Sequence, residues 1–333
     1  MELAKAVLAG ERLALARLLT QVENDTPAGR DALNELFPHT GKAHLVGVTG
    51  APGTGKSSLV SQLVRAFRQP QDDKDPVQVA VVAVDPTSPF TGGALLGDRV
   101  RMRDLSGDPG VFIRSMASRG ALGGLAQRTA AVVQVLDAAG FDVIFIETVG
   151  AGQSEVDIAR LALTTLVVEA PGAGDDIQAS KAGILEIADI LVVNKADQPG
   201  VDSTVRALQA MLGQAESAAG KHLLKSARQA QKQEAAGWEI PVMRTTATSG
   251  EGIRDLAKAI RQHRTHLMDS GGWQQRDQVR LQSELESLLQ SALLNRWRDT
   301  VSWERYQQTL DLLTNRRISP LQAVEKLLNN KQL

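Results

Sequence analysis

The chain has 333 residues, and its 37 lysines and arginines almost balance its 38 aspartates and glutamates. This balance argues against a dedicated nucleic-acid-binding protein, which carries an excess of positive charge. Hydrophobic residues make up 43% of the chain, which is enough for a large buried core and too many for a mainly disordered protein. The sequence contains no cysteine, which excludes disulfides, thiolate metal sites and a cysteine nucleophile.

The first twenty residues combine acidic side chains with a helical apolar pattern, unlike a signal peptide. No apolar run is long enough to cross a bilayer. We therefore expect a cytoplasmic protein with neither a membrane nor a nucleic-acid partner. Apolar residues at helical spacing over residues 3–20 and 29–36 predict an N-terminal helical extension spanning residues 1–42.

From Ala43 onward, short β-branched runs alternate with helical segments. The predicted strands cover residues 44–49, 77–85, 111–115, 142–147, 164–170, 188–194 and 241–246. The predicted helices between and after them cover residues 57–67, 125–139, 155–163, 177–188 and 253–266. Apolar runs with little alternation are typical of parallel strands covered on both faces. The rhythm predicts an α/β domain over residues 43–270, with a mainly parallel sheet and helices on both faces.

Two further helical regions are expected. Residues 202–238 form a polar insertion of one long or two stacked helices, and residues 271–333 form a helical C-terminal arm. Ser319 followed by Pro320 is typical of a helix start. The arm carries Trp297, Trp303 and Tyr306 but has little core of its own, so we expect it to dock on another surface or on a second copy of the chain. The alternative is an arm packed back on its own domain.

The strongest local signal is the segment GAPGTGKS at Gly50–Ser57, which follows a predicted strand and opens a predicted helix. This pattern and context are those of a P-loop, whose glycines let backbone N–H groups wrap a phosphate. Lys56 would reach the β- and γ-phosphates, and Ser57 would bind Mg²⁺ through its hydroxyl.

The tetrapeptide Asn194-Lys-Ala-Asp197 lies at the end of a later predicted strand and indicates which base the bound nucleotide carries. The Asp197 carboxylate can accept hydrogen bonds from guanine N1–H and N2–H₂, and adenine has no such pair of donors on that edge. Lys195 can lie over the ring. The segment Thr245–Ser249, at the end of the last predicted strand, could offer backbone N–H groups to guanine O6. The predicted ligand is therefore GTP or GDP.

Asp85 and Glu147 end two predicted strands at the carboxyl edge of the sheet, where α/β proteins bind ligands. Carboxylates beside a P-loop hold Mg²⁺ directly or through water, so the predicted metal site is Ser57, Asp85 and Glu147. Gly150 would present its N–H to the γ-phosphate. Predicted nucleotide contacts are Gly50, Pro52, Gly53, Thr54, Gly55, Lys56, Ser57, Ser58, Gly150, Asn194, Lys195, Asp197, Thr246 and Ala247.

Three further segments resemble the methylmalonyl-CoA mutase-associated G proteins, which are chaperones of adenosylcobalamin-dependent acyl-CoA mutases. They are DPTSPFTGGALLGDRVRM at 85–102, ETVGAGQSE at 147–155 and PGAGDDIQ at 171–178. The likeness extends from the N-terminal helices to the C-terminal arm. It implies a homodimeric P-loop GTPase with slow intrinsic turnover, stimulated by the mutase. Such a protein binds the mutase's cobalamin-binding domain, gates cobalamin delivery and protects or reactivates the enzyme.

The resemblance also implies roles for residues in three switch segments, 85–102, 147–155 and 172–183. Asp175, Gln178 and Lys181 match functional positions of the third switch, and Arg101 matches a position implicated in hydrolysis. With Lys56 and Glu147 they form the predicted catalytic set. Without the resemblance, Lys181 and Arg101 read as a solvated lysine and a surface arginine, and which of them acts at the γ-phosphate stays open.

Three other functions compete with this interpretation. A nickel-inserting maturation GTPase shares the P-loop class but needs a cysteine or histidine cluster; only His263 and His266 lie one helical turn apart, and a solvated helix surface explains them more simply. A small-molecule kinase would lack the Asn194 tetrapeptide. An interaction protein with a dead nucleotide site is disfavoured because the motif residues are intact.

Overall fold

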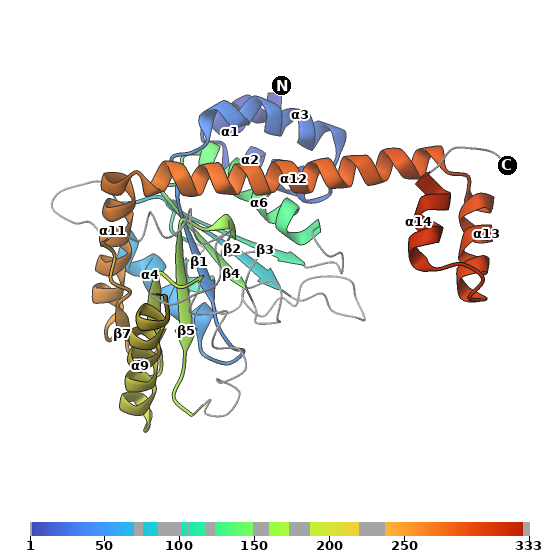
Figure 1. The fold of residues 1–333 in the computed structure, drawn as a ribbon. Coiled ribbons are helices and arrows are strands. Elements are labelled where there is room, and N and C mark those ends of the chain that lie inside the picture. The colour runs from blue at the N-terminus through green and yellow to red at the C-terminus, as the bar shows by residue number, and fades with distance from the viewer. Residues whose placement is uncertain are drawn as a thin grey trace. The chain divides into compact units, whose positions relative to one another are not determined.

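The structure is a computed structural model that describes residues 2–69, 76–85, 102–105, 107–117, 124–148, 160–172, 187–219 and 237–328. Its residues fall into two compact units, Met1–Arg280 and Leu281–Leu333. Figure 1 shows both units as a ribbon.

The first unit is built on a seven-stranded sheet in which all the pairings are parallel, in the order β3-β2-β4-β1-β5-β6-β7. The strands are β1 (His44–Thr49), β2 (Val79–Asp85), β3 (Val111–Ala117), β4 (Val143–Thr148), β5 (Thr164–Glu169), β6 (Ile190–Val193) and β7 (Val242–Arg244). Each lies within or overlaps a predicted strand, so the predicted α/β fold with a parallel sheet is confirmed. Because all strands run the same way, the segments that follow them meet at one edge of the sheet.

Helices cover both faces of the sheet, as strand alternation requires. On one face, α4 (Lys56–Arg68) and α11 (Ile253–Ser270) pack on side chains such as Val48 and Phe145. On the other face, α1 (Glu2–Leu8), α2 (Arg12–Glu23), α3 (Pro27–Leu36) and α6 (Gly124–Ala138) pack on the alternate side chains, such as Leu45 and Ile144. α9 (Val201–Ala219) covers β6. Short 3₁₀ turns lie at Phe37–His39 and Arg103–Leu105.

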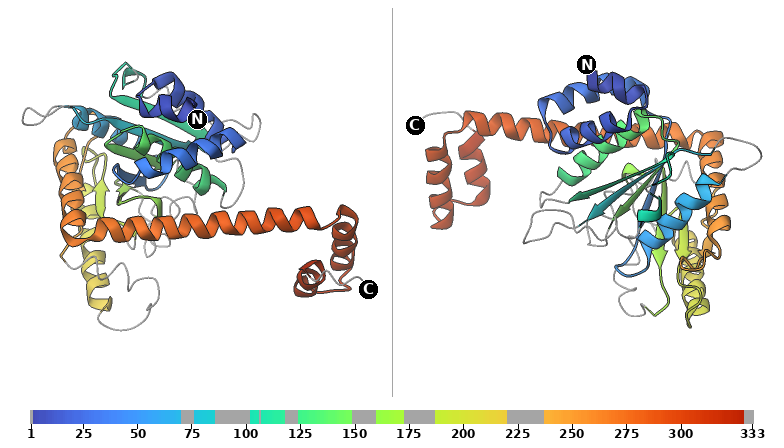
Figure 2. Two further views of the ribbon diagram at one scale, coloured as in Figure 1. Left: turned by 90° about the horizontal axis from the view of Figure 1, so that it is seen from above. Right: turned by 180° about the vertical axis from the view of Figure 1, so that it is seen from behind.

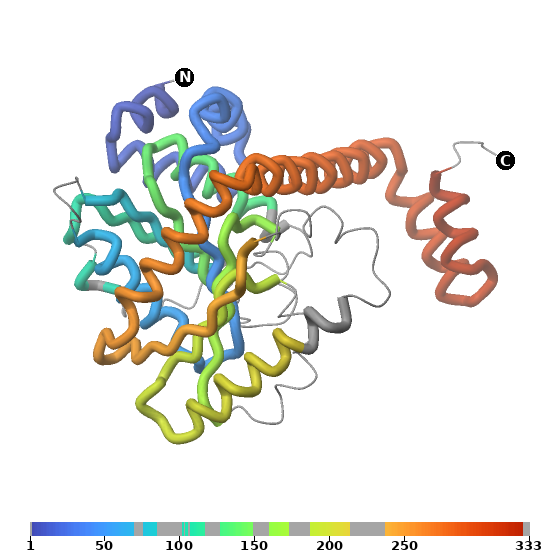
Figure 3. The backbone as a smooth tube through the Cα atoms, turned by 60° about the vertical axis from the view of Figure 1, so that its left-hand side comes forward, coloured from blue at the N-terminus to red at the C-terminus, as the bar shows by residue number. Residues whose placement is uncertain are grey.

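The N-terminal helices form part of the first unit's main core. The predicted helical stretch at 3–20 is split by Gly10, whose φ of 83° ends α1. Leu18, Leu19 and Leu36 are fully buried in the same cluster as Val132 and Leu136 of α6. Figures 2 and 3 show the blue N-terminal helices beside the green α6 segment. The helices therefore complete the cover of one sheet face.

A carboxylate fastens the connection from these helices to β1. The Asp137 side chain accepts hydrogen bonds from the backbone N–H groups of Gly41, Lys42 and Ala43 at 2.5, 3.2 and 2.9 Å. Asp137 lies in α6, so this contact joins the end of the N-terminal segment to the helix that the segment covers. The start of β1 is thereby fixed.

The second unit contains most of α12 (Gly272–Thr300) together with α13 (Trp303–Thr314) and α14 (Pro320–Leu328). The predicted start of the last helix is confirmed, because the Ser319 hydroxyl accepts from the N–H of Gln322 at 3.2 Å. Trp303 is 72% exposed. The exposed leucines of α12 are Leu285, Leu288, Leu289, Leu293 and Leu294. This unit leaves much of its apolar surface uncovered.

The polar insertion is helical over α9, up to Ala219, and its described end at residues 237–238 is not helical. Residues 220–236 of the insertion lie outside the described part. Over the described residues, none of the helices combines the length and hydrophobicity needed to span a bilayer.

Candidate functional site

The P-loop lies between β1 and α4, at the carboxyl edge of the sheet. Gly53 and Gly55 adopt positive φ angles of 79° and 89°, which glycine tolerates and other residues rarely adopt. α4 begins at Lys56, directly after Gly55, so the loop ends on a helix N-terminus. That arrangement supplies the backbone N–H groups and the positive end of a helix dipole that bind phosphate.

Gly50 and Gly53 give a matched pair for testing the loop. A Cβ on Gly50 would lie 2.0 Å from the carbonyl oxygen of Val168 in β5, whereas a Cβ on Gly53 would meet nothing within 4 Å. We expect Gly50→Ala to lower the free energy of unfolding by about 3 kcal/mol or more, since backbone must move. Gly53→Ala should cost about 1 kcal/mol, from its positive φ alone. Urea titrations followed by circular dichroism measure both; equal losses would contradict the close packing of the loop on β5.

The predicted phosphate lysine is held inside this loop. Lys56 is 5% exposed, and its Nζ donates to the carbonyl oxygens of Gly50 and Ala51 at 2.7 and 2.9 Å. Both acceptors belong to the loop that would surround the phosphate. The ammonium group therefore lies within the P-loop, surrounded by its backbone.

The two described members of the predicted metal set are in direct contact. The Ser57 hydroxyl donates to Glu147 Oε1 at 2.5 Å, and both residues are buried. Glu147 lies on the α4 face of β4, and Asp85 is the last residue of the neighbouring strand β2. Ser57 and Glu147 supply hard oxygen donors beside the P-loop, which are the ligands that Mg²⁺ prefers, so these residues fit this ion.

Asn194 joins three segments of the site. Its Nδ2 donates to the carbonyl oxygen of Thr54 in the P-loop at 2.8 Å. Its Oδ1 accepts from the Thr245 hydroxyl and from the Ala247 N–H, both at 3.1 Å. Asn194 itself is 1% exposed. Its side chain therefore holds the P-loop, the tetrapeptide and the predicted guanine loop together.

Unlike the buried Asn194, the other three residues of the tetrapeptide are half-buried or exposed. Lys195 has a positive φ of 57°, a strained conformation for lysine, and Asp197 is exposed. The predicted guanine-loop N–H groups are both engaged in this structure, since Ala247 donates to Asn194 and the Thr246 N–H donates to the Glu251 carbonyl at 3.0 Å. Contact of this loop with guanine O6 stays a prediction.

Comparison with known proteins agrees with this geometry. The family described as methylmalonyl Co-A mutase-associated GTPase MeaB matches residues 15–302. The chain is 42% identical over 327 residues to a protein of Pyrococcus abyssi that is named as a GTPase, covering 98% of this chain and 95% of that one. It is 34% identical over 323 residues to the GTPase ArgK of Escherichia coli, covering 96% and 92% of the two chains.

The chain belongs to the MeaB family of GTPases. A solved structure described as an LAO/AO transport system kinase has the same fold, with a TM-score of 0.69 and 28% identity over 98% of this chain and 95% of that chain. The resemblance inferred from the three switch segments is therefore confirmed, as is the P-loop NTPase-like fold with N- and C-terminal helices.

Several predicted functional residues of this MeaB-family protein lie outside the described part of the chain. They are Arg101, Gly150, Asp175, Gln178 and Lys181, together with most of the three switch segments. Of the other predicted residues, the structure brings together Gly50, Thr54, Lys56, Ser57, Glu147, Asn194 and Ala247 through the contacts described above.

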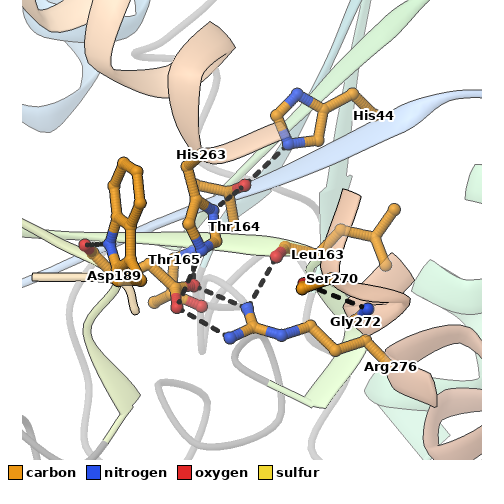
Figure 4. Close-up of polar contacts among 10 residues, drawn as sticks. His44, Leu163, Thr164, Thr165, Asp189, His263, Ser270, Gly272 and Arg276 are labelled. Carbon is orange, nitrogen blue, oxygen red and sulfur yellow. Dashed lines mark hydrogen bonds and ion pairs between the residues drawn. The ribbon is translucent and has the colours of Figure 1, made fainter. Parts of the chain in front are cut away.

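Sequence reasoning was wrong about His263, which was expected on a solvated helix surface. His263 is 1% exposed and is part of a polar cluster at the amino edge of the sheet, drawn in Figure 4. His263 contacts Thr164, the first residue of β5, and Asp189, which directly precedes β6, and both lie far from it in the chain. The spacing of His263 and His266 by one helical turn does not indicate these contacts, because it reflects only the local sequence.

Proposed function

We propose that this MeaB-family protein hydrolyses GTP to GDP and phosphate and acts as a chaperone of an adenosylcobalamin-dependent acyl-CoA mutase. The observation that carries the nucleotide assignment is the Asn194 side chain, which joins the P-loop to both predicted guanine-binding segments. The mutase partner is supported by the family's description as mutase-associated. On this proposal the cobalamin-binding domain of the mutase docks on the GTPase, which gates cofactor delivery and protects or reactivates the enzyme.

The described residues divide the binding of GTP between them. Lys56 exchanges its two loop carbonyls for phosphate oxygens, while the loop N–H groups and the start of α4 surround the β-phosphate. Ser57, Glu147 and Asp85 would hold Mg²⁺, which neutralises charge that develops on the phosphates when it is bound. Asp197, exposed at the mouth of the site, accepts hydrogen bonds from guanine.

Hydrolysis is proposed to depend on the partner. Lys181 or Arg101, brought to the γ-phosphate when the mutase docks, would neutralise charge in the manner of an arginine finger, with Asp175 and Gln178 acting in the same switch. GTP would order the switches and hydrolysis would release them, which changes how the mutase domain is held. A nucleotide that bound both states equally would gate nothing.

The test is steady-state GTP hydrolysis by the full chain, with ATP as control, alone and with the cobalamin-binding domain of each acyl-CoA mutase of the host added in turn. We expect GTP-selective turnover that rises with one mutase domain, and a Lys181→Ala variant that binds GTP normally but is not stimulated. Turnover unmoved by every mutase domain would overturn the chaperone role. Normal stimulation of Lys181→Ala would overturn the third-switch assignment.

A homodimer is the proposed assembly, supported by the exposed leucines of α12 and by exposed Trp303 and Tyr306 in α13. Leucines on a long helix are the kind of surface that a second copy covers. Sedimentation of the full chain tests this.

The nickel-inserting alternative lacks support in the described part of the chain, where no three His, Asp or Glu side chains are grouped as a metal site.

A further inference from the structure

A buried relay of hydrogen bonds and ion pairs links three strands and two helices at the amino edge of the sheet (Figure 4). His44, the first residue of β1, has its Nε2 2.6 Å from the hydroxyl of Thr164, the first residue of β5. The same hydroxyl lies 2.8 Å from Nδ1 of His263 in α11. His263 Nε2 lies 3.4 Å from Oδ1 of Asp189, which directly precedes β6. Thr164 is 0% exposed and both histidines are 1% exposed.

The relay ends on the first turns of α12. Arg276 donates from its two terminal nitrogens to both oxygens of Asp189 at 2.9 Å, and also to the carbonyl oxygen of Leu163 at 2.7 Å. One helical turn earlier, Trp273 lies against the His44 ring, with ring centroids 5.9 Å apart. Residues 272–280, which we call the α12 root, are therefore attached to the sheet through this relay.

When both imidazoles are neutral, the donors and acceptors of the relay can be assigned in one consistent order. The Thr164 hydroxyl carries one proton and can donate to only one histidine. If His263 carries its proton on Nε2, which faces Asp189, its Nδ1 is free to accept from Thr164, and His44 Nε2–H then donates to the Thr164 oxygen. A proton added to His263 Nδ1 would turn this acceptor into a second donor to the Thr164 oxygen, so the Thr164 O–H would lose its acceptor on His263.

The positively charged groups around the relay also oppose protonation of its histidines. Asp189 is the carboxylate that faces it, and Arg276 already pairs with that carboxylate. Arg264 and His266 of α11 and the opposite histidine add further positive or ionisable groups, and Arg264 lies over the Trp273 ring. Burial is the main cause that lowers the pKa of His44 to about 3 and of His263 to about 4, although Asp189 acts in the opposite direction on His263.

The Asp189–His263–Thr164 order resembles the hydrogen-bonded triads of hydrolases. In those enzymes the hydroxyl faces a substrate, whereas Thr164 is completely buried and its oxygen lies between two imidazoles. The relay therefore serves to hold the three strands and the helices α11 and α12 together.

We propose that His44, Thr164, Asp189, His263 and Arg276 form an acid-sensitive latch that fastens the α12 root to the amino ends of β1, β5 and β6. With neutral imidazoles the latch is closed. A proton on His263 creates a second cation that competes with Arg276 for Asp189, and the repulsion is relieved when Arg276 and the α12 root leave and water enters.

The size of the effect follows from linkage between proton binding and opening. A histidine in water has a pKa of 6.5, and in the closed latch His263 has a pKa of about 4. The open state thus binds the proton more readily, so acid favours opening below the pKa of the open state. Between pH 8 and pH 5 the opening equilibrium should rise about 30-fold through His263 alone.

Hydrogen exchange of the full-length protein, saturated with GDP, tests the latch. Mass spectrometry would follow residues 272–280 and, as an internal reference, β4 at Val143–Thr148, each corrected for the intrinsic effect of pH on exchange. We expect exchange in the α12 root to accelerate about 30-fold from pH 8 to pH 5 while β4 stays unchanged. His263→Gln, which cannot be protonated, should remove this response, and His266→Gln, one turn away on α11, should keep it.

Unchanged exchange in the α12 root, acceleration of β4 in step with it, or a full acid response in His263→Gln would each overturn the latch. If His263→Gln does not fold, a titration of the histidine rings of the wild-type protein by NMR decides. A His263 midpoint below pH 5 supports the closed neutral relay, and a midpoint near 6.5 overturns it.

Discussion

Replacing Lys56 by alanine is expected to weaken GTP binding by about 100-fold. In the wild-type protein the ammonium group is buried inside the P-loop, 2.7 and 2.9 Å from two loop carbonyls, which we propose it exchanges for phosphate oxygens. Hydrogen bonds between charged groups contribute about 1.5–3 kcal/mol each, and part of that gain offsets the loss of the loop contacts. Alanine can supply neither the charge nor the donors.

Isothermal titration with a non-hydrolysable GTP analogue measures the change directly. Lys258→Ala, which removes an exposed lysine from α11, is the matched control and should bind as the wild-type protein does. An affinity within threefold of wild type for Lys56→Ala would mean that the P-loop does not bind the phosphates through this lysine. Circular dichroism would confirm that both variants are folded.

Asp197→Asn is expected to change which base the protein prefers. On the proposed assignment the carboxylate accepts hydrogen bonds from guanine N1–H and N2–H₂, whereas the amide would turn one of these acceptors into a donor that faces another donor. GTP affinity should fall on the order of 1,000-fold, since buried polar groups are left unpaired. Xanthine carries an oxygen where guanine has its N2 amine, so XTP should bind the variant at least about tenfold more tightly than it binds the wild type.

Competition between GTP and XTP for the same labelled analogue measures this exchange of preference. Asp202→Asn is the matched control, because Asp202 lies close by in sequence at the start of α9 and is exposed in an ion pair with Arg244. It should leave the base preference unchanged. Loss of GTP binding without any gain for XTP would indicate that Asp197 supports the loop without touching the base.

The sheet could be predicted from the sequence because its signals are local. Each strand is a short run of apolar and β-branched residues, and the strands pack on both faces, so continuous burial such as that of His44–Thr49 follows from the run itself. The P-loop could be predicted for the same reason, since strand, glycines and helix are adjacent in the chain. Register and order of the strands required the structure.

Contacts between distant segments were beyond a local pattern. The sequence indicated Asn194 as a nucleotide residue, but its three hydrogen bonds join positions as far apart as Thr54 and Ala247. His263 was misjudged because its burial depends on Thr164 and Asp189, which approach it only when β5, β6 and α11 are packed. Helical spacing to His266 carries no information about such neighbours.

The packing of the N-terminal helices on α6 affects the order in which this core can form during synthesis. Leu18, Leu19 and Leu36 are synthesised about 100 residues before Val132 and Leu136, their neighbours in the core. At translation rates of roughly 5–20 residues per second, these leucines stay without their partners for about 5–20 s. Throughout that interval the N-terminal helices present an apolar surface that only later synthesis of α6 can bury.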